Sequence, residues 1–168
     1  MSADRNTPSL PQRLDPLALP LRGSHLIEAS AGTGKTFTIA MLYVRLVLGH
    51  GGEHSGHGRA LTPPEILVVT FTEAATQELR DRIRARLAQA ARYFRVLAAE
   101  VSPPASPDLL YDLRAGYAPD EWPACARKLE LAAQWMDEAA VSTIHGRCNR
   151  MLHEHAFDSL SLFTQTLE

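Results

Sequence analysis

The sequence has few cysteines, no long apolar run and no strong excess of charge of either sign. Its two cysteines, Cys125 and Cys148, lack the close spacing of a metal-binding pair, which argues against a disulfide framework and favours a reducing compartment. Residues 1–20 lack the apolar core of a signal peptide, and no stretch reaches membrane-spanning length. We therefore expect a cytoplasmic protein. With a formal net charge of -2, any contact with nucleic acid must depend on local basic clusters.

The order of apolar segments predicts an α/β fold with a parallel sheet. The 168 residues suffice for one domain with a sizeable core. Short apolar runs predict buried strands at 25–29, 66–70 and 141–144. Helical patterns are expected at 35–48, after Thr72, at 109–114, at 120–139 and at 146–155. Such sheets usually have about five strands or more, so three indicate the beginning of a domain.

The most specific pattern is Glu-Ala-Ser-Ala-Gly-Thr-Gly-Lys-Thr at residues 28–36, between a predicted strand and a predicted helix. This context predicts a phosphate-binding P-loop, whose backbone N–H groups and helix N-terminus face the anion. Lys35 would contact the β- and γ-phosphates, and the Thr36 hydroxyl would bind Mg²⁺; both are predicted to be catalytic. The full set of predicted nucleotide-binding residues is Ala29, Ser30, Ala31, Gly32, Thr33, Gly34, Lys35 and Thr36.

Two segments that contain glycine can each be interpreted in two ways. The first position of the strict P-loop pattern is glycine, whereas here it is Ala29, which fits if its φ is negative. A glycine-rich turn that carries Lys-Thr without binding nucleotide is the alternative, and the flanking strand and helix favour the P-loop. Residues 49–58 contain three histidines among glycines. Because glycines hold no coordination geometry, we expect a solvated flexible loop there instead of a metal site.

A polar segment follows each of the three predicted strands. The P-loop is the first, Thr-Phe-Thr-Glu-Ala-Ala at 70–75 is the second, and Ser-Thr-Ile-His-Gly-Arg at 142–147 is the third. The carboxyl ends of parallel strands meet at one edge of a sheet, where ligands bind in open α/β folds. We therefore expect the three segments to form one ligand-binding edge.

These three segments, in this order, resemble the RecB-like proteins among the UvrD-like superfamily 1 DNA helicases. The resemblance covers nearly the whole chain, including 14–21, 26–40, 67–80 and 134–157, and alanine is also common at the first P-loop position of those proteins. It implies an incomplete RecA-like P-loop NTPase domain formed by residues 1–94 and 136–168. Residues 95–135 would be the start of an inserted helical subdomain.

The resemblance also implies ATP and Mg²⁺ as cofactors and single-stranded DNA along the second and third segments. Phe71 is either a base-stacking residue or a core aromatic, Thr72 either a phosphate contact or a helix cap, and His145 either a DNA contact or a packing residue at a turn. Arg82, Arg84 and Arg86 are expected on a solvated helix face. The implied DNA-binding residues are Thr70, Phe71, Thr72, Arg80, Thr143 and His145.

Parts of a complete motor are not found in the sequence. Gln12 does not match the upstream glutamine that reads adenine in many of these helicases. Asp137 and Glu138 lie in a helical pattern instead of at the end of a buried strand, so they are not assigned as the acidic pair that holds Mg²⁺. Because phosphoryl transfer needs positioned metal, water and charge, we expect that this chain alone neither unwinds DNA nor hydrolyses ATP at a useful rate.

The resemblance implies the N-terminal ATP-binding portion of an ATP-dependent 3′-to-5′ DNA helicase and exonuclease subunit. Such a subunit acts at DNA ends in double-strand break repair and recombination, in the bacterial cytoplasm, with RecC-like and RecD-like partners. One alternative is a stand-alone truncated P-loop protein that binds nucleotide or a partner without helicase activity. Another is a small kinase, which would require a substrate lid and acidic metal ligands that the sequence does not display.

Overall fold

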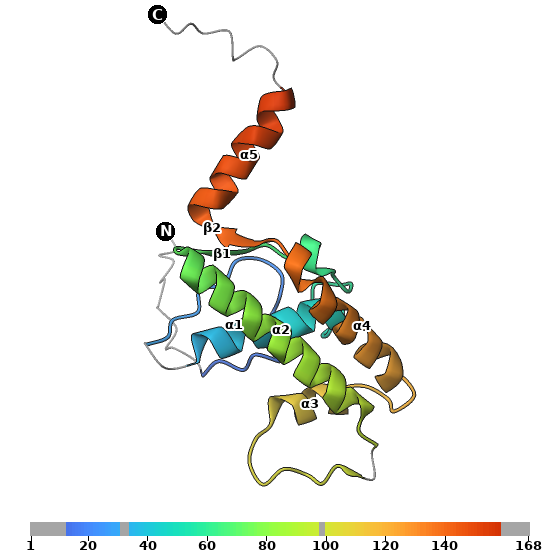
Figure 1. Ribbon diagram of the computed structural model, residues 1–168. Coiled ribbons are helices and arrows are strands. Elements are labelled where there is room, and N and C mark those ends of the chain that lie inside the picture. The colour runs from blue at the N-terminus through green and yellow to red at the C-terminus, as the bar shows by residue number, and fades with distance from the viewer. Residues whose placement is uncertain (1–12, 31–33, 98–99, 159–168) are drawn as a thin grey trace, which may run out of the picture.

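The computed structural model describes residues 13–30, 34–97 and 100–158. Figure 1 shows α1, α2 and α4 packed together beneath a short sheet, with α5 leading away from this body. No helix in these ranges is long and apolar enough to cross a membrane. The elements are α1 (Lys35–Leu48), η1 (Pro63–Glu65), β1 (Val68–Thr70), α2 (Glu73–Arg95), α3 (Leu109–Ala115), α4 (Trp122–Gln134), η3 (Trp135–Glu138), β2 (Val141–Thr143) and α5 (Ile144–Asp158).

The sheet consists of β1 and β2, which pair in parallel. Val68 lies opposite Val141 and Thr70 opposite Thr143, so the carboxyl ends of the two strands are level with each other. Helices α2, α3 and α4 form the crossover that a parallel pair requires. The predicted α/β class is thus confirmed, and the two strands place the segments that follow them at one edge.

The strand predicted at residues 25–29 is not formed. These residues have no strand assignment, and Leu26 is 85% exposed. A buried parallel strand needs a hydrogen-bonded neighbour and cover on both faces. In the described part of the chain, β1 and β2 pair with each other, and nothing covers Leu26. An apolar run indicates a tendency to be buried, but it does not supply the neighbour.

The core lies between α1, α2, α3 and α4. The four apolar residues predicted on one face of α2, namely Leu79, Ile83, Leu87 and Phe94, are all buried. Full burial of a side chain of this size stabilises the fold by about 1.5–3 kcal/mol. Leu129 and Met136 are also fully buried, although the helix predicted over 120–139 ends at Gln134 and continues as the tighter η3.

A buried arginine holds two irregular segments against α1. Arg45 is fully buried, and its Nη1 donates to the carbonyls of Pro16 at 2.9 Å and Leu19 at 2.7 Å. Its Nη2 donates to the carbonyl of Ser55 at 3.2 Å. Burial lowers the pKa of Arg45, and the carboxylate of Asp15 opposes that shift. Residues 49–58 were expected to be a solvated loop, but Arg45 fixes one side of that loop to the core.

The predicted cap of α2 is present. Thr72 precedes the helix, and its hydroxyl accepts a hydrogen bond from the N–H of Ala75 at 3.1 Å. The Thr72→Ala variant is therefore expected to lose about 1 kcal/mol of unfolding free energy, which urea denaturation measures. Thr72→Ser keeps the oxygen and should unfold close to wild type. Equal stability of Thr72→Ala and wild type would show that this cap contributes nothing.

Candidate functional site

Helix α1 begins at Lys35, directly after Gly34, the last glycine of the P-loop pattern. Gly34 has φ +87°, a left-handed conformation that favours glycine, and its carbonyl accepts from the N–H of Thr38 at 2.9 Å. Lys35 is exposed and Thr36 is half-buried at this terminus. Ala29 and Ser30 lie just before it, whereas the predicted nucleotide-binding residues Ala31, Gly32 and Thr33 are outside the described residues.

The N-terminus of α1 differs from those of α2 and α3 in its N-cap residue. This residue is Gly34, which has no side chain to form a cap hydrogen bond, and the first turn of the helix contains no acidic residue. In contrast, Thr72 caps α2 and Asp108 caps α3. The first N–H groups of a helix have no partner within the helix and form the positive end of its dipole. The start of α1 is therefore suited to an anion such as phosphate.

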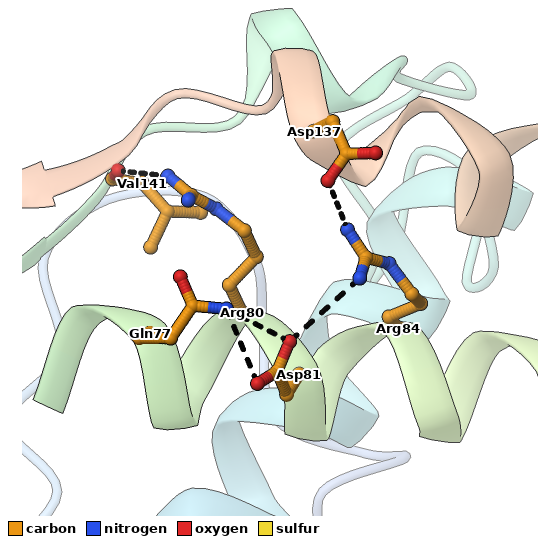
Figure 2. A network of polar contacts seen from close by, with 6 residues as sticks. All are labelled: Gln77, Arg80, Asp81, Arg84, Asp137 and Val141. Carbon is orange, nitrogen blue, oxygen red and sulfur yellow. Dashed lines mark hydrogen bonds and ion pairs between the residues drawn. The ribbon is translucent and has the colours of Figure 1, made fainter. Parts of the chain in front are cut away.

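The acidic pair at residues 137 and 138 does not follow a buried strand, and its first member is in an ion pair. Asp137 lies in η3, where it forms an ion pair with Arg84 of α2 (Figure 2). This placement confirms the interpretation that Asp137 and Glu138 are in a helical segment and do not follow a buried strand. Arg84, expected on a solvated face, thus takes part in a contact between α2 and η3.

The aromatic residue after β1 points into solvent. Phe71 is 90% exposed, although its position at the end of a strand also suited a core residue. The core alternative is therefore wrong. An exposed ring at the carboxyl edge of a parallel sheet is available to stack on a flat partner.

Threonine hydroxyls hold the turn around Phe71. The hydroxyls of Thr70 and Thr76 lie 2.5 Å apart, and each is within hydrogen-bond distance of the Thr72 carbonyl, at 3.2 Å and 3.1 Å. Thr76 is buried, so this cluster sits beneath the turn. Together with the Thr72 cap, these bonds fix the backbone on both sides of the exposed ring.

The turn after β2 combines a buried residue with an exposed one. Thr143 is only 6% exposed; its hydroxyl accepts from the N–H of Gly146 at 3.0 Å and donates to Oε1 of Glu73 at 3.2 Å. His145 is exposed, and its Nε2 lies 3.2 Å from Nδ2 of Asn149. Of the two candidates in this segment, only His145 presents its side chain to solvent.

Arg80 supports β2. Its side chain is half-buried, and Nη2 donates to the carbonyl of Val141 at 2.9 Å (Figure 2). In the same view Arg84 approaches Asp81, with 3.7 Å between Nη1 and Oδ1. The arginines of α2 are thus not equivalent, and sequence spacing alone did not separate them.

The structure also brings in residues that the sequence analysis missed. Glu73 was part of the second segment but was given no role, and it contacts Thr143. Arg45 interrupts the apolar run of α1, and a lone charge in such a run is the signal that could have identified a buried arginine. Arg86, expected in solvent, lies with its guanidinium carbon 4.4 Å from the centre of the Phe37 ring.

Comparison with known proteins gives a consistent result over nearly the whole chain. The chain is similar to the RecBCD enzyme subunit RecB of Escherichia coli K12, with 52% identity over 156 residues that cover 93% of this chain and 12% of the relative. The subunits of the same name from Haemophilus influenzae and Chlamydia trachomatis are 45% and 35% identical, covering 87% and 79% of this chain. The chain spans about an eighth of the length of these relatives. Residues 11–165 match the model of the UvrD/REP helicase N-terminal domain, so this chain belongs to the UvrD/REP helicase family.

Proposed function

We propose that this chain supplies the ATP-binding portion of a RecB-like, ATP-dependent 3′-to-5′ DNA helicase and exonuclease subunit. The observation that carries the proposal is the start of α1, where Lys35 and Thr36 follow the left-handed Gly34. A helix that begins at the Lys-Thr of the pattern agrees with a P-loop, and the chain's similarity to RecB subunits supports the same function. In this proposal, residues 1–94 and 136–168 belong to a RecA-like domain, and 95–135 begin a helical insertion.

MgATP would bind at the P-loop, with the backbone of 29–34 around the phosphates. Lys35 would contact the β- and γ-phosphates, and Thr36 would be a ligand of Mg²⁺, which balances charge that develops during phosphoryl transfer. Hydrolysis also needs an acidic residue near the metal and a positioned water. Asp137 faces Arg84 and does not meet that need. We therefore expect the isolated chain to bind MgATP and to hydrolyse it slowly.

Single-stranded DNA would lie along the edge where β1 and β2 end. Phe71 would stack on a base, and Thr70, Thr72 and His145 would contact the backbone nearby. A helicase must hold DNA of any sequence, and stacking suits this task because every base has a flat face. Arg80 and Thr143 complete the proposed DNA-binding set. Because Arg80 is half-buried and bonded to Val141, and Thr143 is buried and bonded to Glu73, we propose that they support the exposed residues of the set.

The proposed cellular role follows from the relatives. Their names describe a subunit of a larger enzyme, RecBCD. We propose that the protein works with RecC-like and RecD-like subunits at DNA ends, in double-strand break repair and recombination in the bacterial cytoplasm. The competing function is a stand-alone truncated P-loop protein that binds nucleotide or a partner without helicase activity, and binding of single-stranded DNA favours the first function over this one.

Replacing Phe71 with alanine tests the DNA-binding edge. Affinity for a fluorescent oligothymidylate, measured by anisotropy, is expected to fall by roughly fivefold or more, because stacking on one base contributes about 1–3 kcal/mol. Phe71→Trp should bind close to wild type. Trp135→Ala removes a half-exposed ring from η3 and should leave the affinity unchanged. Equal binding by Phe71→Ala and wild type would remove Phe71 from the proposed edge.

A further inference from the structure

One face of α2 carries three polar side chains that contact the segment containing β2. Glu73, Arg80 and Arg84 are separated by seven and four residues, a spacing that places them on one side of a helix. Figure 2 shows the second and third of these contacts. In the same order along α2, the partners are Thr143, Val141 and Asp137. The segment 137–143 therefore runs alongside α2 in the opposite direction, and the Glu73 contact lies at the carboxyl edge of the sheet.

The contact with Glu73 occupies the proton of the Thr143 hydroxyl, which is buried. A threonine hydroxyl has one proton to donate and two lone pairs to accept with. Thr143 gives its proton to the Glu73 carboxylate and accepts from the N–H of Gly146 in the first turn of α5. Thr143 is 6% exposed, whereas Glu73 is an exposed residue, so the hydroxyl is the buried partner of this bond. At 3.2 Å the bond is longer than most O–H···O bonds, so its contribution has to be measured.

The approach of α5 to this hydroxyl is close. A Cβ atom added to Gly146 would lie 3.0 Å from Oγ1 of Thr143, which is tighter than ordinary van der Waals contact. The first turn of α5 is therefore fitted to one orientation of the Thr143 side chain. In this orientation the hydroxyl donates to the Glu73 carboxylate, at the first position of α2.

We propose that Glu73 is a positioning residue that fixes the start of α5 against the start of α2. The turn after β1, with Phe71, and the turn after β2, with His145, are thereby held as one rigid edge. The expected effect on DNA binding rests on the proposed function, whereas the role of Glu73 in holding α5 does not. A carboxylate repels phosphate, so we do not expect Glu73 itself to contact the DNA backbone.

Two substitutions at this position separate the hydrogen bond from the charge. Glu73→Gln removes the negative charge and keeps a carbonyl oxygen that can accept from Thr143. Glu73→Ala removes the same charge and the acceptor. Since the two variants have equal net charge, any difference between them reports the hydrogen bond. Glu78→Gln and Glu78→Ala are the matched control pair, because Glu78 is exposed on the same helix and pairs only weakly with Arg82, at 3.5 Å.

Hydrogen exchange of the Gly146 amide, followed by NMR without DNA, tests the contact. We expect exchange roughly fivefold faster in Glu73→Ala than in Glu73→Gln, the ratio given by one ordinary hydrogen bond, with no such difference in the Glu78 pair. Exchange is compared with global stability from urea unfolding, so that general destabilisation is recognised. Equal Gly146 exchange in the two Glu73 variants would overturn the inference.

Binding of the oligothymidylate tests the consequence. We expect Glu73→Ala to bind roughly three- to tenfold more weakly than Glu73→Gln, the range for one lost hydrogen bond. Equal affinities would overturn the positioning role. If wild type itself does not bind, the proposed DNA function fails and the role in DNA binding fails with it, whereas the Gly146 comparison still decides whether Glu73 holds α5.

Discussion

Replacing Lys35 with alanine is expected to weaken binding of MgATP by about 10- to 150-fold, the range for losing hydrogen bonds to a charged group. Lys35 is exposed at the first position of α1, and the N-cap residue before it is Gly34, which has no side chain to cap the helix N–H groups. Its ammonium would add a full positive charge to the partial charge of the helix terminus, both directed at the β- and γ-phosphates. Equilibrium titration with a fluorescent ATP analogue measures the change.

The sequence offers a closely matched control for this variant. Lys128 is the other lysine of the chain, and it lies exposed on α4. Lys128→Ala changes the net charge by the same amount and should leave MgATP affinity within error of wild type. If both variants weakened binding equally, general electrostatics would account for it; if neither did, the P-loop assignment would be wrong.

The second large effect is expected at Arg45. Replacing it with methionine should lower the unfolding free energy by about 3–5 kcal/mol, because methionine fills the space of the stem but donates nothing to three carbonyls. The carbonyls of Pro16, Leu19 and Ser55 accept from Arg45 at 2.9, 2.7 and 3.2 Å. Leaving acceptors of this kind unpaired costs about 1–3 kcal/mol each when they stay buried. Urea unfolding monitored by circular dichroism measures the loss.

Arg92→Met is the control for this experiment. Arg92 is exposed on α2, and substitutions at such positions usually change stability by no more than about 0.5 kcal/mol. Arg45→Lys should fall between wild type and Arg45→Met, because a single ammonium cannot reach the carbonyls with the same fork geometry. An unchanged urea midpoint for Arg45→Met would show that the bonds of Arg45 do not hold residues 16–19 and 55 to the core.

The helices that were predicted well are those whose ends and apolar face can be recognised from their own residues. Helix α1 was expected at 35–48 and is found at Lys35–Leu48, since glycines with positive φ, Gly34 and Gly49, stand at both ends of an apolar run. The apolar face of α2 was predicted because Leu79, Ile83 and Leu87 repeat every four residues. In contrast, the strand at 25–29 failed because strand formation depends on a neighbour elsewhere in the chain.

The residues of the candidate site also differ in whether they depend on a local motif or on distant parts of the chain. The start of α1 follows from a local motif, so the sequence could predict that Lys35 and Thr36 lie at a helix N-terminus. The contacts of Glu73 and Arg80 join residues 70 and 61 positions apart, and periodicity shows which face a residue occupies but not what it meets there. The exposure of Phe71 had the same uncertainty, because an aromatic after a strand suits both core and surface.

The measurement that tests the assignment of the nucleotide site most directly is an amide NMR spectrum of the ¹⁵N-labelled chain with and without saturating MgATP. We predict that the largest shifts occur at the P-loop pattern and the first turn of α1, residues 29–38, and that Lys35→Ala removes them. No shifts at saturation would contradict the proposal. Shifts centred instead on the apolar cavity lined by Phe94, Leu97 and Trp122 would also contradict it.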